Sequence, residues 1–101
     1  MEINKSSNGT LVVLSLKGKL DSNTALSLEK EIDDVLATEK LYNLEIDMEE
    51  LTYLSSAGLR VLLNAQKKLM SLEAHLVITN VNENIKSVFE ITGFMGILNI
   101  M

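Results

Sequence analysis

Several residue types that often carry function are missing or scarce in this chain. It has no cysteine, no proline and no tryptophan, and its only histidine is His75. Without cysteine the chain cannot form disulfides, use a thiol as a nucleophile or bind a metal through thiolates. A single histidine at the start of a predicted strand is typical of a surface position and supports neither a metal site nor a serine–histidine pair. We therefore predict no catalytic residues, no metal site and no cofactor, and we do not expect an enzyme.

Nucleotide-binding loops are also missing. The glycines are isolated, and neither GxGxxG nor GxxxxGK followed by Ser or Thr occurs. The acidic residues Asp47, Glu49 and Glu50 are close in sequence, but their spacing matches no calcium loop, and a solvated acidic loop is the favoured interpretation. A nucleotide or small-ligand binder is thus the least favoured function.

Acidic residues outnumber basic ones by fourteen to nine, which gives a formal net charge of −5. Eleven of the acids lie in residues 1–50. No basic cluster is present to bind phosphates, so we predict no nucleic-acid partner. The acidic half of the chain either forms a solvated helix face or steers the protein toward a basic partner.

Apolar residues make up 47 % of the chain but form no run that is long and uncharged enough to span a bilayer. The first residues, MEINKSSNG, lack the apolar core of a secretory signal. A cytoplasmic protein without membrane attachment is the simplest interpretation.

Hydrophobic periodicity divides the chain into alternating strands and helices. No linker interrupts the 101 residues, so we predict a single domain over 1–101. Asn8-Gly9 predicts a hairpin with a type I′ turn, and Asp21, Ser22 or Asn23 can cap the first helix. The predicted elements are strands at 2–6 and 10–17, a helix at 24–37, a strand at 43–48, an extended link at 52–54, a helix at 57–71, a strand at 75–79, a helix that begins after Asn80 or Asn82 and ends at Gly93, and a last strand within 94–100.

The predicted order of elements is β-β-α-β-α-β-α-β. After the opening hairpin, strands and helices alternate, which favours right-handed crossovers between strands of one sheet. The predicted fold class is therefore α/β, with a mixed β-sheet and helices packed on it.

The stretch Ser55-Ser56-Ala57-Gly58 joins a strand-like segment to a helix and has two interpretations. In the structural one, a serine caps the helix, and Ala57 and Gly58 let its first turn lie close to the sheet. In the functional one, the fold tolerates a phosphate on a serine at the helix N-terminus, and the phosphate adds about −1.5 to −2 charges to the surface there. Such a charge would repel a docked partner. These four residues alone do not decide between a cap and a switch.

Three segments together resemble one protein family. The run DMEELTYLSSAGLRVL, from Asp47 to Leu62, resembles the signature of STAS domains, specifically of bacterial anti-sigma factor antagonists. The run GKLDSNTA, from Gly18 to Ala25, is similar to the start of the family's first helix, and residues Asn80 to Phe94 are similar to its closing helix. The three matches occur in the family's order and cover essentially the whole chain.

The resemblance implies a partner switch. An unphosphorylated member of this family binds an anti-sigma factor with serine kinase activity, the kinase phosphorylates the member and binding is lost, and a serine phosphatase restores it. Alignment through Gly58 and Leu59 places the phosphorylated serine on Ser56, with Ser55 as the less favoured acceptor. The predicted partner-binding residues are Asp21, Ser22, Asn23, Thr24, Tyr53, Leu54, Ser55, Ser56, Ala57, Gly58, Leu59 and Arg60.

Other possibilities stay open. In one, the chain is a non-regulatory STAS module, a subunit of a larger sensory or transport assembly, and the serine stretch is only a helix cap. Arg60 either pairs with a phosphate or with an acid of the partner, or it is solvated. The apolar faces of the three predicted helices are interpreted as core, which favours a monomer when the protein is free.

Overall fold

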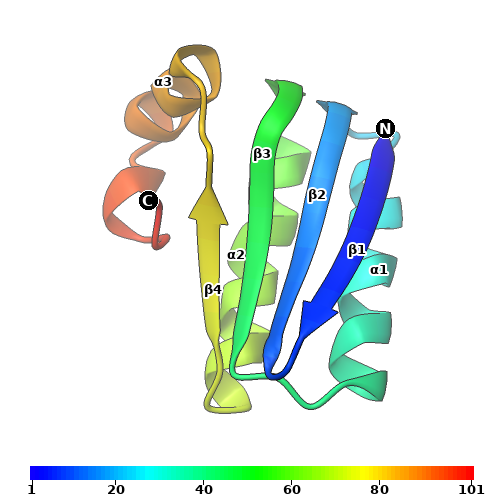
Figure 1. Ribbon diagram of the computed structural model, residues 1–101. Helices are drawn as coiled ribbons and strands as arrows, with labels where there is room; N and C mark the ends of the chain where they lie inside the picture. Colours follow the sequence, from blue (N-terminus) through cyan, green and yellow to red (C-terminus); the bar gives the residue numbers. More distant parts are fainter.

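The computed structural model describes all residues, 1–101, and contains a four-stranded mixed sheet with helices packed on it (Figure 1). The strands are β1 (Glu2–Asn8), β2 (Leu11–Leu20), β3 (Asn43–Leu54) and β4 (His75–Thr79). They lie in the sheet in sequence order. β1 pairs with β2 in antiparallel orientation, and the other two pairings are parallel. The predicted α/β class with a mixed sheet is confirmed.

Three helices complete the domain. They are α1 (Ala25–Thr38), α2 (Ser56–Ser71) and α3 (Glu83–Thr92). Figure 1 shows α1 and α2 together behind the sheet, while α3 lies beyond β4 near its upper end. Each helix buries an apolar stripe, as a period of 3.6 residues requires. None of the helices has the length and apolar character that crossing a membrane requires.

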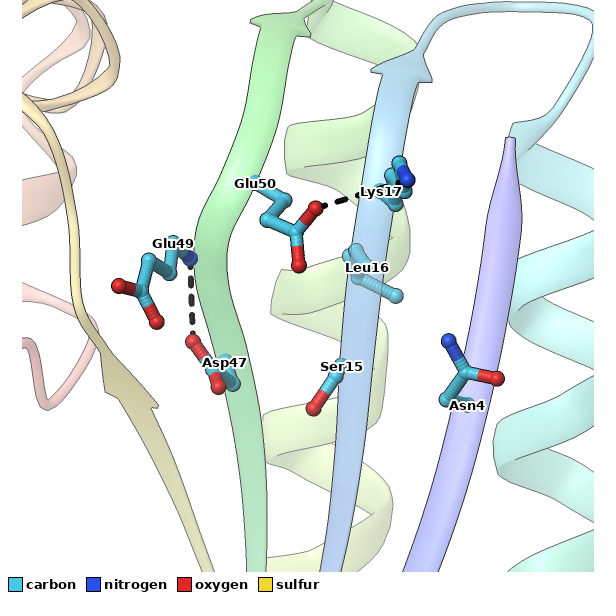
Figure 2. Close-up of a pocket in the computed structure, with 7 residues that line it drawn as sticks. All are labelled: Asn4, Ser15, Leu16, Lys17, Asp47, Glu49 and Glu50. Atoms are coloured by element: carbon cyan, nitrogen blue, oxygen red, sulfur yellow. Dashed lines mark hydrogen bonds and ion pairs between the residues drawn. The ribbon is translucent and has the colours of Figure 1, made fainter.

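The two faces of the sheet have different environments. Leu14 and Ile46 are register partners on β2 and β3, and both are fully buried under the helices. Side chains alternate along a strand, so the neighbouring pair, Ser15 and Asp47, points to the other face, which α1 and α2 leave open (Figure 2). One cluster of 25 apolar residues forms the core. The open face of the sheet carries polar side chains such as Ser15 and Asp47 together with the partly buried Val13 and Val77.

The hairpin turn differs from the prediction. Its two central residues are Gly9 and Thr10, and only Gly9 has a positive φ, of 63°. A type I′ turn needs positive φ at both central residues, so the predicted type I′ turn is wrong. Glycine at the first central position is the pattern of a type II′ turn.

Two other segments also differ from the predicted elements. Residues 52–54, predicted as a link, continue β3 up to α2. The predicted strand within 94–100 instead begins with a 3₁₀ turn at Phe94–Gly96 and pairs with β4 only through a parallel bridge between Ile78 and Ile100. The 3₁₀ turn occupies the first residues of this segment. The side-chain amide of Gln66 also donates to the Ile97 carbonyl oxygen at 2.9 Å, so few residues remain to pair with β4.

Both ends of α3 are as predicted. Asn82 is its N-cap, and the side-chain oxygen of Asn82 accepts a hydrogen bond from the Ile85 N–H group at 3.0 Å. Gly93 follows the helix with a φ of 79°, the left-handed conformation of a C-cap glycine.

Candidate functional site

The carboxyl ends of β2 and β3 meet at one end of the sheet, at the top of Figure 1. β2 leads into α1 and β3 leads directly into α2, so both helices begin at this end. The Ser55 N–H group donates to the Leu20 carbonyl oxygen at 2.9 Å and joins the two connections. Parallel α/β sheets place their binding residues at this end. We call it the carboxyl-end surface and define it by residues 21–24, Leu26, Tyr53, residues 55–57 and Arg60.

The loop from Asp21 to Thr24 is held by reciprocal hydrogen bonds. Asp21 Oδ1 accepts from the N–H groups of Asn23 at 2.9 Å and Thr24 at 3.1 Å. In return, Thr24 Oγ1 accepts from the Asp21 N–H group at 2.9 Å and donates to the Lys19 carbonyl oxygen at 2.9 Å. This exchange resembles a capping box, but it closes the turn that precedes α1. The N-cap of α1 is Thr24, which makes no side-chain cap bond, so the prediction that Asp21, Ser22 or Asn23 caps this helix is wrong. The exposed side chains of Ser22 and Asn23 project from the loop.

The same loop stabilises the ionised form of Asp21. Partial burial acts to raise the pKa of this carboxyl group. The hydrogen bonds from the N–H groups of Thr24 and Asn23, together with the Thr24 hydroxyl, outweigh burial and hold the pKa below its ordinary value. The carboxylate of Asp21 is therefore ionised, and it accepts hydrogen bonds from Asn23 and Thr24 in the same loop.

Ser55 and Ser56 are adjacent but have different environments. Ser55 is half-buried and is the N-cap of α2, with its Oγ accepting from the Gly58 N–H group at 3.2 Å. Ser56 is the first residue of α2 and is exposed, and its hydroxyl has no hydrogen-bond partner within the protein. The structural interpretation of the serine stretch therefore applies to Ser55, while the hydroxyl of Ser56 is available for chemistry.

Gly58 allows α2 to approach the sheet closely. A Cβ atom at this position would lie 2.6 Å from Cγ of Leu20 and 2.9 Å from Cδ1 of Leu54. Both distances are shorter than packed carbon atoms tolerate, because optimal contacts lie at about 3.5–4.0 Å. The prediction that small residues let the first helical turn lie against the sheet is confirmed at Gly58.

The structure corrects the prediction for two apolar residues. Leu54 and Leu59 were predicted to offer apolar contact area to a partner, but only 4 % and 3 % of their surfaces are exposed. Both side chains belong to the core between the sheet and α2. Tyr53 is 50 % exposed and Arg60 is also exposed, so these two side chains reach the carboxyl-end surface.

Leu26 is an apolar side chain of this surface that the sequence analysis did not identify. It lies in the first turn of α1 and is 72 % exposed. The apolar stripe of α1 includes Ala25 and Leu28, and Leu26 falls off that stripe. A large apolar residue off the buried stripe of an amphipathic helix is the signal that could have identified it.

A small hollow on the open face of the sheet gathers the acidic residues noted in the sequence (Figure 2). Its volume is about 80 Å³. Asp47 Oδ1 accepts from the Glu49 N–H group and from the Asn80 side-chain amide, both at 3.0 Å. Glu50 lies 3.7 Å from the Lys17 ammonium. No three histidine or acidic side chains are arranged to hold a metal ion. The hollow is lined by Asn4, Ser15, Leu16, Lys17, Asp47, Glu49 and Glu50.

Residues 2–101 match the family model of the STAS domain. An anti-sigma-B factor antagonist of Listeria monocytogenes is 34 % identical over 83 residues, which cover 82 % of this chain and 72 % of that protein. The crystal structure of an anti-sigma factor antagonist from Mycobacterium paratuberculosis has a TM-score of 0.86 at 23 % identity, over 98 % of this chain and 83 % of that one.

The anti-sigma factor antagonist SpoIIAA is also similar in structure. Its unphosphorylated form has a TM-score of 0.77 at 17 % identity, over 99 % of this chain and 87 % of that one. Its phosphorylated form, from Bacillus, has a TM-score of 0.76 at 17 % identity, over 99 % of this chain and 91 % of that one. At these identities, the structural matches show a shared fold.

Proposed function

Because this chain belongs to the STAS domain family, we propose that it is an anti-sigma factor antagonist controlled by phosphorylation of Ser56. Its proposed partner is an anti-sigma factor with serine kinase activity, bound while Ser56 is unmodified and released once Ser56 carries a phosphate. A serine phosphatase then returns the protein to its binding form. One observation carries the proposal: an exposed serine with a free hydroxyl stands at the first residue of α2, on the carboxyl-end surface.

Ser56 suits a kinase better than Ser55 does. Modification of Ser55 would sacrifice its bond to the Gly58 N–H group, and a helix cap of this kind contributes about 1 kcal/mol. Ser56 loses no such bond. In the transfer, Ser56 Oγ forms a bond to the γ-phosphorus of ATP while the bond from that phosphorus to ADP breaks. The hydroxyl proton passes to a base of the kinase.

The phosphate acts through charge and does not require refolding. It adds about −1.5 to −2 charges at neutral pH. The helix dipole tolerates negative charge at the start of α2, and the Ser56 side chain contributes no hydrogen bond that the fold would lose. A partner packed over this position would have to bury the new charge, and that cost weakens binding.

The exposed side chains around Ser56 suit a protein partner. Tyr53 and Leu26 supply apolar area, and Ser22 and Asn23 supply polar groups, a mixture typical of protein interfaces. Relatives support the class of partner, since the similar Listeria protein is an anti-sigma-B factor antagonist. Support for the modification comes from SpoIIAA, a fold relative whose structure is known in unphosphorylated and phosphorylated forms.

Binding measurements test the switch directly. Isothermal titration calorimetry compares the unmodified protein, the Ser56→Ala variant and protein carrying phosphoserine at position 56, each with the kinase anti-sigma factor of the same organism. We expect Ser56→Ala to bind like the unmodified protein and the phosphorylated form to bind at least about tenfold more weakly. Equal binding of the three forms would refute the switch and favour the passive STAS module.

A further inference from the structure

Arg60 is an exposed cation in the second turn of α2, four residues after Ser56, and no carboxylate lies within ion-pair distance of it. The next basic residue of this helix is Lys67. Several other cations of the chain do have acidic partners. These pairs are Lys5 with Glu39, Lys17 with Glu50, and Lys68 with Asp33.

Helix geometry brings the Arg60 side chain toward Ser56. Residues four apart share one helical face, with Cβ atoms about 5–6 Å apart. Helical side chains lean toward the N-terminus, so a long side chain at position 60 covers the turn that contains Ser56. The guanidinium group presents a planar fork of N–H donors that matches the spacing of phosphate oxygens. Arg60 can therefore hold a phosphate on Ser56 without a change in the backbone.

We propose that Arg60 pairs with a phosphate on Ser56, and that this pairing removes the free positive charge that Arg60 otherwise offers to a binding partner. This inference rests on the proposed modification of Ser56. In the unmodified protein, Arg60 offers an unpaired positive charge to an acidic group of the partner. In the phosphorylated protein, the guanidinium turns to the phosphate, so the surface gains an anion and also loses its free cation. An acid of the partner then meets repulsion where it had a counter-charge.

A phosphorus NMR titration tests the pair without a kinase. Phosphoserine is installed at position 56 during synthesis, in the otherwise unchanged chain and in the Arg60→Gln, Arg60→Lys and Lys67→Gln backgrounds. The second dissociation constant of the phosphate is then measured. We expect this constant to fall about threefold in the Arg60→Gln background, because the cation that favours the dianion is gone. Arg60→Lys keeps the charge without the fork and should give an intermediate value.

Lys67→Gln is the matched control, since it removes the same charge from the same helix but lies at position 67, far from Ser56. We expect it to leave the dissociation constant unchanged. Either an unchanged constant in the Arg60→Gln background or an equal fall in both backgrounds would overturn the pair. If Arg60→Gln fails to fold, the Arg60→Lys background provides the test. A dissociation constant equal to that of the unchanged chain would then show that the guanidinium fork of Arg60 does not hold the phosphate.

This test is separate from that of the proposed function. An installed phosphate reports on Arg60 even if no kinase modifies Ser56 in the cell. Conversely, loss of partner binding upon phosphorylation in an Arg60→Gln background would keep the switch whatever the titration shows, because the phosphate charge alone weakens binding.

Discussion

The Ser55 N–H group donates to the Leu20 carbonyl oxygen at 2.9 Å, and this bond fixes the start of α2 to the end of β2. The side chain of Leu20 is also the group that Gly58 approaches most closely. Together these contacts hold Ser56 at the surface, beside the loop of residues 21–24. Substitutions that disturb the contacts of Ser55 and Gly58 with Leu20 should therefore lower the stability of the protein more than substitutions of Ser56 do.

Substitution of Gly58 by alanine should destabilise the protein. The added methyl group would meet Leu20 at 2.6 Å, so either α2 or the packed side chains of Leu20 and Leu54 would have to move. Overpacking of this kind costs about 1–3 kcal/mol. The free energy of unfolding is measured by urea denaturation, with Gly96→Ala as the control, since a Cβ atom at Gly96 meets nothing within 4 Å. Equal stability of Gly58→Ala and the unchanged protein would contradict the close approach.

Replacement of Ser55 and of Ser56 by alanine should have different effects on the free energy of unfolding. Ser55→Ala removes the acceptor of the Gly58 N–H bond and should lower the free energy of unfolding by about 1 kcal/mol. Ser56→Ala removes an exposed hydroxyl without a partner and should change it by less than about 0.5 kcal/mol. Thermal or urea unfolding of both variants makes the comparison. A larger loss from Ser56→Ala than from Ser55→Ala would reverse the assigned roles.

Asn82 should be important for stability because its side chain makes two connections. Its Oδ1 caps α3 by accepting from the Ile85 N–H group, and its Nδ2 donates to the Leu51 carbonyl oxygen at 2.9 Å. We expect Asn82→Ala to cost about 1–2 kcal/mol, and Asn82→Asp to recover part of this because it keeps the cap acceptor. The exposed neighbour Asn84 provides the control substitution to alanine. A negligible effect of Asn82→Ala would show that neither bond contributes in solution.

The contribution of Asp21 to stability should depend on pH. Its folded-state pKa is lowered, so the ionised form favours folding. This contribution is complete above the ordinary aspartate pKa of about 3.9 and is lost as the pH falls through the lower folded-state value. The difference in free energy of unfolding between the unchanged protein and Asp21→Ala should therefore be constant above about pH 5 and shrink below about pH 4.

Urea unfolding at a series of pH values measures this difference. Asp34→Ala serves as the control, because Asp34 is an exposed carboxylate of α1 whose side chain makes no hydrogen bond. A difference for Asp21→Ala that grows as the pH falls would have the wrong sign for a stabilised carboxylate.

Much of the fold could be predicted from the sequence because local patterns and core contacts agree. The apolar positions Ile32 and Val35 fall on the buried stripe of α1, and Asn82 and Gly93 end α3 as caps usually do. The length of β3 could not be predicted in the same way. From Asp47 to Glu50 it advances three residues while β2 advances two, from Ser15 to Lys17. This bulge breaks the alternation that a strand pattern relies on.

The candidate site was only partly predictable from the sequence. Serine is a good N-cap at either position, so the division between Ser55 and Ser56 depends on where the backbone enters the helix. Ser55 has a ψ of 170°, an extended conformation, which makes it the cap. The burial of Leu54 and Leu59 and the exposure of Leu26 depend on how each element faces the core, which sequence spacing near an element's end does not fix.

The most direct test of the central claim is site-resolved mass spectrometry after incubation with the kinase anti-sigma factor of the same organism and ATP. The unchanged protein, Ser55→Ala and Ser56→Ala are compared. We expect the phosphate on Ser56 in the first two proteins and none in Ser56→Ala, because of the two adjacent serines only Ser56 has a hydroxyl that is exposed and free of hydrogen bonds. Phosphate on Ser55 in the Ser56→Ala variant, or no phosphate on any of the three proteins, would contradict the account.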